Sequence, residues 1–258
     1  EYRRQRQMCI RDRFKQELVR YFPHPIKGLR NEPRTKLADY LGWHRQAPGK
    51  WFVGLPLLCG RLSGEMKAGL RRIVDTYKVE IRLTPNQDLL LCNIGTGQRT
   101  TLANELAAIG FETPEAPPLL ARHAIACPAL PLCGLAVTEA ERILPEVLDR
   151  LDGLFRRIGI EKSVLVRMTG CPNGCARPYM AEIGLVGSGV DQYQLWLGGT
   201  PNLSRLAEPY LEKMPLDALE STLEPLLTAW HAAGGRRSFG DFVVKSGREH
   251  VSAMLAAA

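Results

Sequence analysis

Four cysteines in two closely spaced pairs constrain this chain more than any other feature. The first pair, Cys127 and Cys133, lies in ACPALPLC, and the second pair, Cys171 and Cys175, lies in TGCPNGC. Proline and glycine surround both pairs, so we expect them in loops, where backbone amides stay free to donate to sulfur. Four thiolates are typical of a [4Fe–4S] cluster, because such a cluster needs soft, deprotonated ligands that converge from different directions.

The segment between the two pairs has the pattern of a helix followed by a strand. In residues 138–159 apolar side chains recur at helical intervals, and Thr138 and Glu141 stand at the spacing of a capping box. SVLVRMTG, residues 163–170, then alternates like a strand and leads into the second pair. A loop, a helix, a strand and a second loop in this order can bring both pairs to one point.

Zinc binding and simple packing stay open as alternative roles for the cysteines. A structural zinc site also takes four thiolates, but its knuckles usually have two or four residues between cysteines, whereas the intervals here are five and three. A free cysteine is also commonly a small buried apolar residue. We assign this packing role to the remaining three cysteines, which are Cys9, Cys59 and Cys92.

The residues around the second pair resemble a known family. TGCPNGCARPYMAEIGLVG, followed by YQLWLGGTPN, is similar to the cluster and siroheme signature of the assimilatory sulfite reductase hemoproteins. LGWHRQ, RLTPNQDLLLC, CPALPLCGLAVTEAERILP and SFGDFVVKSG resemble the same family in the same order. The resemblance runs from about residue 14 to the C-terminus, and it is strongest to the ferredoxin-dependent type.

This resemblance implies an enzyme and its cofactors. Members of the family reduce sulfite to sulfide with six electrons, at a siroheme coupled to a [4Fe–4S] cluster, and in the ferredoxin-dependent type ferredoxin is the electron donor. The implied cluster ligands are Cys127, Cys133, Cys171 and Cys175. Cys175 would also bridge the cluster to the siroheme iron, which makes it the expected catalytic residue. The resemblance further implies that the chain is the C-terminal half of a larger enzyme.

The siroheme contacts follow from the same resemblance. Siroheme carries many carboxylates, and binding them requires cationic and amide donors. The expected contacts are Asn173, Arg177, Arg82 and Asn86. Two alternatives remain: a ferredoxin-nitrite reductase fragment, which would share the cofactor pair, and a non-catalytic cluster- or zinc-binding module.

The pattern outside the cysteines predicts an α+β fold. Residues 51–110 read as strand, helix, strand, strand and helix, which is typical of a ferredoxin-like sandwich with helices on one face of an antiparallel sheet. In VEIRLT, the residues Val79, Ile81 and Leu83 alternate with polar residues and are expected to face the core.

We therefore expect two domains after a short leader. A ferredoxin-like nitrite/sulfite reductase half-domain is expected over residues 14–120, and the α+β domain that binds siroheme and the [4Fe–4S] cluster over residues 121–258. Residues 1–13 are expected to be a non-native or disordered leader.

Composition is compatible with these expectations. A formal net charge of +7 suits an acidic electron donor such as ferredoxin, because opposite charges raise the encounter rate. Part of that charge comes from arginines of the expected leader, so we expect no nucleic-acid partner. No segment approaches about twenty uninterrupted apolar residues, so we expect no membrane association. Seven cysteines, an odd number, suit a reducing compartment, and with the resemblance this predicts bacterial cytoplasm or plastid stroma.

Overall fold

The structure, a computed structural model, describes residues 13–14, 16–22, 39–111 and 119–256. The chain divides into two compact units, residues 1–35 and residues 36–258. Most of the expected leader, residues 1–12, lies outside the described residues, and so does Cys9. In the first unit the described residues form a short helical segment. The second unit contains two β-sheets and all of the predicted site residues.

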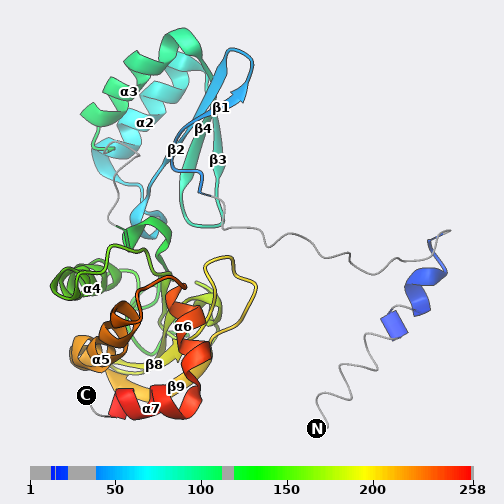
Figure 1. The fold of residues 1–258 in the computed structure, drawn as a ribbon. Helices are drawn as coiled ribbons and strands as arrows, with labels where there is room; N and C mark the ends of the chain where they lie inside the picture. The colour runs from blue at the N-terminus through cyan, green and yellow to red at the C-terminus, as the bar shows by residue number, and fades with distance from the viewer. Residues whose placement is uncertain (1–12, 15, 23–38, 112–118, 257–258) are drawn as a thin grey trace. The chain divides into compact units, whose positions relative to one another are not determined.

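The first sheet is antiparallel, with the strand order β1-β2-β4-β3. Its strands are β1 (Gly42–Ala47), β2 (Lys50–Leu55), β3 (Glu80–Leu83) and β4 (Leu89–Gly95). Helices α2 (Gly64–Tyr77) and α3 (Arg99–Ala108) cover one face of it (Figure 1). Leu55 and Leu91 of the sheet are buried in one apolar core with Leu70 and Leu102 of the helices. This arrangement confirms the ferredoxin-like prediction and adds β1 to it.

Strand β3 departs from the burial predicted for its alternating apolar residues. Val79, which precedes the strand, is buried, but Ile81 is 43% exposed and Leu83 is 80% exposed. The prediction that all three face the core is therefore wrong for Ile81 and Leu83. The physical reason is that β3 is the last strand in the order of this sheet, so its side chains have a neighbouring strand on one side within the described residues.

The second sheet has the strand order β5-β6-β7-β8-β9. Its strands are β5 (Ile125–Ala126), β6 (Val166–Thr169), β7 (Ile183–Gly189), β8 (Gln192–Leu197) and β9 (Glu208–Pro215). The first three strands are parallel to one another, and the last three are joined in antiparallel fashion. Neither β5 nor β9 is among the elements expected from the sequence.

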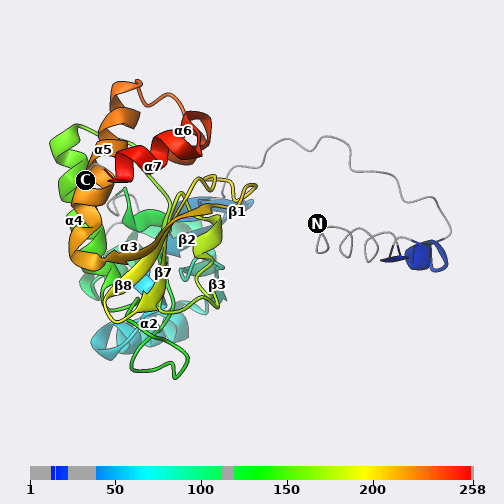
Figure 2. The ribbon, with the colours of Figure 1, turned by 90° about the horizontal axis from the view of Figure 1, so that it is seen from below.

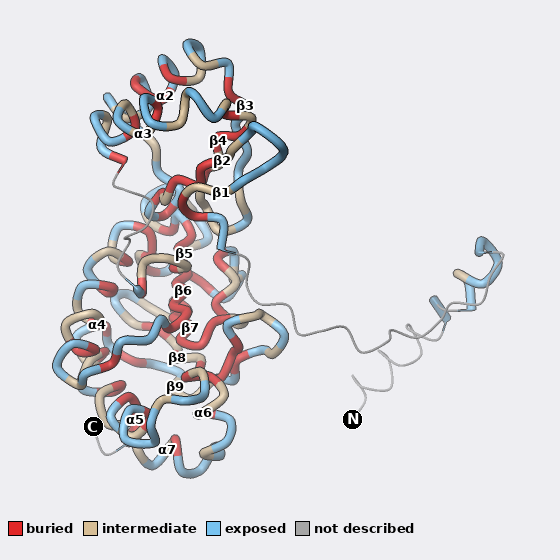
Figure 3. Tube along the Cα trace, turned by 45° about the horizontal axis from the view of Figure 1, so that its top comes forward, coloured by how far each residue is buried: buried red, intermediate tan, exposed pale blue. Residues whose placement is uncertain are grey.

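Helices cover one face of the second sheet. They are α4 (Leu144–Ile158), α5 (Leu219–Ala232), α6 (Phe239–Ser246) and α7 (Arg248–Ala256). Leu151 of α4 and Leu223 of α5 are fully buried in one core with Met168 and Leu185 of the sheet. Figure 2 shows α5 and α7 side by side, and Figure 3 shows burial along β6 and the first part of β7.

Helix α4 begins at Leu144 and not at Thr138, so the predicted capping box is wrong. Thr138 instead places its Oγ1 3.1 Å from the Tyr193 hydroxyl, and Glu141 forms an ion pair with Arg61. Both side chains are thus used in tertiary contacts. Proline is favoured in the first turn of a helix, because its missing N–H would have no partner there, and a proline occupies that position in α4.

None of the helices in the described parts of the chain combines the length and the apolar character needed to cross a membrane.

Candidate functional site

Two of the predicted cluster ligands follow neighbouring parallel strands. Cys127 comes directly after β5, and Cys171 lies two residues beyond the end of β6. Because the strands are parallel and Ala126 pairs with Met168, both cysteines lie at the same edge of the sheet. The Cys127 amide donates to the Met168 carbonyl oxygen at 3.2 Å. The first cysteine loop, residues 127–137, therefore leaves the sheet beside the second cysteine loop, residues 170–180.

Gly170 joins the two cysteine loops. Its amide donates to Cys127 Sγ at 3.3 Å, and its carbonyl oxygen accepts from the amides of Val137 and Thr138 at 2.8 Å and 3.3 Å. A Cβ added at Gly170 would lie 2.6 Å from the Thr138 carbonyl oxygen and 2.7 Å from Ala129 Cβ. Real Cβ atoms do not approach other atoms so closely, so the contact between the loops requires glycine here.

The four thiols differ in their surroundings. Cys127 and Cys171 are buried, Cys133 is half-buried and Cys175 is exposed. Burial raises the pKa of Cys127, backbone amides lower it, and the charges of Cys175 and Cys171 raise it again. Three of the four predicted ligands therefore lie within electrostatic reach of one another, and Cys133 shares a loop with Cys127.

The described residues contain no group of three or more His, Cys, Asp or Glu side chains close enough to hold a metal ion. Ligation by the four cysteines therefore stays a prediction. Chemically the donor set fits an iron–sulfur cluster, since it consists of thiols with a backbone amide already directed at one sulfur.

The turn between β3 and β4 contacts the second cysteine loop and the end of β5. Arg177 Nη2 donates to the Pro85 carbonyl oxygen at 2.5 Å and lies 3.5 Å from Asn86 Oδ1. Gln87 Nε2 donates at 2.9 Å to the carbonyl oxygen of Ala126, the residue before the first loop. The structure thus brings together two of the predicted siroheme contacts, Asn86 and Arg177.

The other two predicted siroheme contacts stand apart from this group. Arg82 is an exposed residue of β3 and donates from Nε to Glu80 Oε1 at 2.8 Å. Asn173 is exposed in the second cysteine loop, two residues before Cys175. Within the described residues, neither side chain forms a hydrogen bond with Asn86 or Arg177.

Sequence reasoning missed Arg167, a residue of β6 with a fully buried side chain. Its Nη1 lies 3.5 Å from the Arg177 carbonyl oxygen, and its Nε and Nη2 have no hydrogen-bond partner among the described residues. Burial lowers the pKa of Arg167 to about 10, with a further contribution from the positive charge of Arg177. The signal in the sequence was a single charged residue inside the strand pattern SVLVRMTG. An anion bound beside it would neutralise this buried charge, so the residues fit an anionic cluster or macrocycle.

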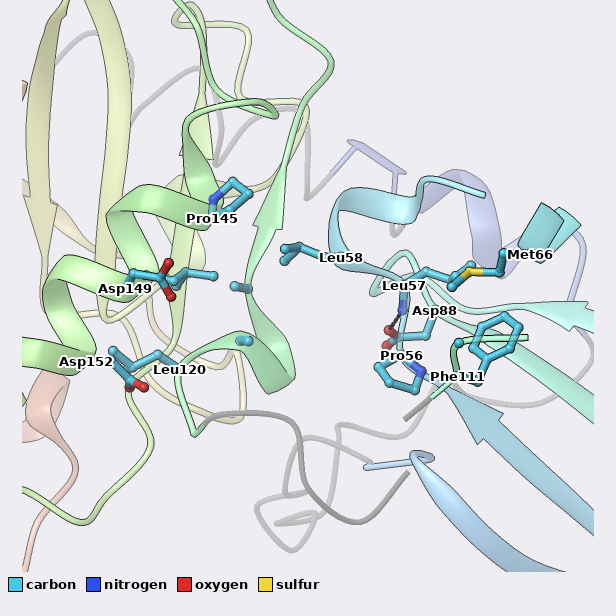
Figure 4. Close-up of a pocket in the computed structure, with 14 residues that line it drawn as sticks. Pro56, Leu57, Leu58, Met66, Asp88, Phe111, Leu120, Pro145, Asp149 and Asp152 are labelled. Atoms are coloured by element: carbon cyan, nitrogen blue, oxygen red, sulfur yellow. Dashed lines mark hydrogen bonds between the residues drawn. The ribbon is translucent and has the colours of Figure 1, made fainter. Parts of the chain in front are cut away.

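A cavity of about 350 Å³ lies elsewhere in the second unit. Figure 4 shows its walls, which include Pro56, Met66, Phe111, Pro145 and Asp149. Asp88 Oδ1 accepts from the Leu57 amide at 3.3 Å, and burial raises the pKa of Asp88 to about 6. None of the predicted site residues lines the cavity. Residues 112–118, which adjoin its wall in sequence, lie outside the described residues, so we assign it no role.

Residues 44–109 match the family described as the nitrite/sulfite reductase ferredoxin-like half domain, and this range covers nearly all of the first sheet with α2 and α3. Over 241 residues, 91% of the chain, the sequence is 43% identical to the sulfite reductase [ferredoxin] of Synechococcus elongatus. The chain belongs to the sulfite reductase hemoprotein family. It spans 39% of the length of that relative.

Further relatives of the family agree. The sulfite reductase [NADPH] hemoprotein beta-component of Chromohalobacter salexigens is 39% identical over 243 residues, which are 92% of this chain and 42% of that protein. The solved structure of the Mycobacterium tuberculosis NirA protein shares the fold, with a TM-score of 0.77 and 23% identity over 92% of this chain and 46% of that one. Dissimilatory sulfite reductase I shares it more loosely, with a TM-score of 0.56 and 12% identity over 80% of this chain and 69% of that one.

Proposed function

We propose that this chain is the cluster-binding portion of a ferredoxin-dependent sulfite reductase, which reduces sulfite to sulfide with six electrons. The observation that carries the proposal is the 43% identity to the ferredoxin-dependent enzyme of Synechococcus elongatus, over a stretch long enough to include both cysteine pairs. Identity to the NADPH-dependent relative is lower, at 39%, which favours ferredoxin as the donor. A ferredoxin donor would place the protein in bacterial cytoplasm or plastid stroma.

The proposed division of labour follows the two sheets. Residues 14–120 would form the ferredoxin-like half-domain, and residues 121–258 would form the domain that binds the [4Fe–4S] cluster and siroheme. The match of residues 44–109 to the half-domain family supports the first assignment. The meeting of both cysteine loops at the β5–β6 edge supports the second.

The chain's own residues would hold the cofactors. The proposed cluster ligands are Cys127, Cys133, Cys171 and Cys175. When bound, siroheme coupled to the cluster supplies a centre that passes electrons singly to sulfite. Cys175 is the proposed bridging ligand, and its thiol is the exposed one of the four. Asn173, Arg177, Arg82 and Asn86 are the proposed donors to the siroheme carboxylates.

Two features of the fold would prepare the site before any cofactor arrives. Gly170 holds the loops together through its amide and carbonyl, which supports the proposal that the fold would bring the two cysteine pairs together. The β3–β4 turn fixes the Arg177 side chain through Pro85 and Asn86, which limits the rotamers that this arginine must give up on binding an anion.

The experiment that tests the cofactor assignment is an anaerobic absorption spectrum with iron and sulfide analysis, on this chain expressed with a siroheme supply. We expect siroheme bands and about five irons per chain, one from the macrocycle and the rest from the cluster. Cys175→Ser should lose the coupled centre, whereas Cys92→Ala, a buried cysteine of β4 outside the loops, should keep it. A zinc-loaded product without labile sulfide would contradict the proposal in favour of the zinc module.

The substrate is tested separately with the complete enzyme that contains this chain, loaded with both cofactors. Reduced ferredoxin is offered with sulfite or with nitrite, and kcat/KM is compared for the two. A preference for sulfite supports the proposal, and a preference for nitrite supports the nitrite reductase alternative.

A further inference from the structure

Strand β6 carries different chemistry on its two faces. Val166 and Met168 are fully buried in the core that the helices cover. Successive residues of a strand point to opposite faces, so Arg167 and Thr169 lie on the other face. Both of these polar side chains are also fully buried. A charged residue hidden on that second face requires a partner of its own.

The described residues do not supply that partner. Arg167 Nε and Nη2 and Thr169 Oγ1 lack any hydrogen-bond partner among them. The neighbouring charge that acts on Arg167 belongs to Arg177, which is also a cation. An isolated buried charge is strongly unfavourable unless an opposite charge or strong acceptors neutralise it.

The second cysteine loop covers this face of the sheet. Gly184 pairs with Arg167 across β6 and β7, so the two residues share a face. A Cβ at Gly184 would lie 2.4 Å from the carbonyl oxygen of Pro178, near the end of the loop. The Arg177 carbonyl oxygen approaches Arg167 Nη1 from the same loop. The unpartnered guanidinium edge therefore lies beneath the segment that carries Cys171 and Cys175.

We propose that Arg167 is the buried cation that neutralises an anionic group bound at the second cysteine loop. That group is either the thiolate-ligated cluster or a siroheme carboxylate, and the inference rests on the proposed function. Nε and Nη2 form one edge of the guanidinium, which suits a bidentate contact with a carboxylate or two hydrogen bonds to sulfur. Thr169 Oγ1 is a further donor on the same face.

A purely structural role makes a different prediction. If Arg167 only braces the loop through the Arg177 carbonyl oxygen, its removal should destabilise the chain whether or not a cofactor is bound. If it neutralises a bound anion, replacing it with an apolar side chain of similar size should leave the cofactor-free chain as stable or more stable. Only the loaded chain should then be weakened.

The test compares the full chain with Arg167→Met and Arg167→Lys. Arg156→Met is the matched control, since it removes the same charge from an exposed position on α4. Each chain is prepared without iron and its thermal unfolding is recorded. Each is then loaded anaerobically with ferrous iron and sulfide, and the rate of iron loss to a chelator and the cluster midpoint potential are measured. A parallel preparation with a siroheme supply gives the macrocycle content.

We expect Arg167→Met to unfold at the wild-type temperature or above it, and to lose iron roughly tenfold faster or more. Its cluster potential should shift downward, because a nearby positive charge favours the reduced cluster. Arg167→Lys should fall between Arg167→Met and wild type, and Arg156→Met should match wild type. If the anion is a siroheme carboxylate, iron loss and potential stay at wild type while siroheme content falls.

Two results would overturn the inference. If Arg167→Met takes up and retains both cofactors as wild type does, the charge of Arg167 is not needed to bind an anion. Loss of stability in the cofactor-free forms of both Arg167→Met and Arg167→Lys would show that Arg167 has only a structural role in holding the loop. A wild-type chain that takes up neither cofactor is a separate failure, because it overturns the proposed function on which the inference rests.

Discussion

The two sheets of the second unit are covered in different ways. The first sheet packs α2 and α3 on one face and leaves His44 stacked on Phe52, with ring centroids 4.8 Å apart, on the other. The second sheet packs helices on one face and the second cysteine loop on the other. The first sheet therefore needs one apolar face. Both faces of the second sheet are buried, and Arg167 and Thr169 lie on the face that the loop covers.

This difference separates stability from chemistry. An apolar face gains free energy by leaving water, whereas a polar face that is buried without partners costs free energy. In the second sheet the helix-covered face should hold the fold together, and the loop-covered face should be a place where stability is given up for binding. In the cofactor-free chain, removing a side chain from the helix-covered face should therefore lower the free energy of unfolding. Replacing an unpartnered polar side chain on the loop-covered face should raise it.

The largest effect is expected on the apolar face. Met168→Ala removes a fully buried side chain from the core of the second sheet, and it should lower the free energy of unfolding by about 3 kcal/mol. The measurement is urea denaturation of the cofactor-free chain. Val244→Ala, at a position that is 52% exposed on α6, is the control and should change it by less than about 0.5 kcal/mol. Equal effects of the two substitutions would contradict the proposed role of this face.

The next effect concerns the carboxyl group of Glu182, which is almost fully buried just before β7. It accepts from the amides of Leu165 and Gly240, and burial raises its pKa from 4.5 to about 7. Between these values the folded chain keeps a proton that the unfolded chain has lost, so stability falls as pH rises. The loss amounts to roughly 3 kcal/mol and is complete above about pH 7.

Glu182→Gln isolates that contribution. Its amide does not titrate, so the free energy of unfolding should lack this decline between pH 4.5 and about pH 7. Urea midpoints at a series of pH values give the two profiles. Parallel profiles for Glu182→Gln and wild type would show that the carboxyl group titrates alike in both states.

A smaller effect is expected where the cysteine loops meet. Gly170→Ala forces a Cβ against Thr138 and Ala129, and overpacking of this kind should lower the free energy of unfolding by about 2 kcal/mol. The buried Cys127 thiol should also react faster with an alkylating reagent. Gly153→Ala, at a position within α4, is the matched control, because the added Cβ would have no neighbouring group within 4 Å. This substitution should raise the free energy of unfolding by about 0.5 kcal/mol. Equal stability of the two alanine variants would refute a close contact at Gly170.

The smallest effect should have the opposite sign. Thr169→Val replaces an unpartnered buried hydroxyl with a methyl group, so the cofactor-free chain should gain about 1 kcal/mol. Urea denaturation of the two chains measures it. A loss of stability instead would mean that the hydroxyl already has a partner, and the two faces of the second sheet would then be more alike than we infer.

Much of the fold was predictable because its signals are local. In the helix from Gly64 to Tyr77 and in the hairpin that begins at Ile183, the spacing of apolar residues along the local sequence is enough to indicate the element. Other elements have no such signal. β5 has only two residues, and β9, EPYLEKMP, contains two prolines, which are unusual within a strand.

The candidate site divides in the same way. The cysteine ligands could be proposed from the sequence alone, because thiols beside proline and glycine indicate a metal or cluster site without reference to the fold, and their ligation stays a prediction. Gly170 and Arg167 were not, since their roles depend on which segment covers which face of the sheet. The turn at Asn86 was expected near siroheme on resemblance alone, and its contact with Arg177 depends on the packing of distant segments.

The parallel pairing of β5 and β6 also bears on the order of assembly. Strands that run side by side in the same direction cannot be joined by a tight turn, so α4 lies in the chain between Cys127 and Cys171. Such distant partners meet only after the entropy of closing the intervening chain has been overcome. We therefore expect the polypeptide to fold before iron and sulfide can be bound by both loops. The newly made chain would then pass through a folded stage in which the exposed thiol of Cys175 is accessible to oxidants before the cluster is bound.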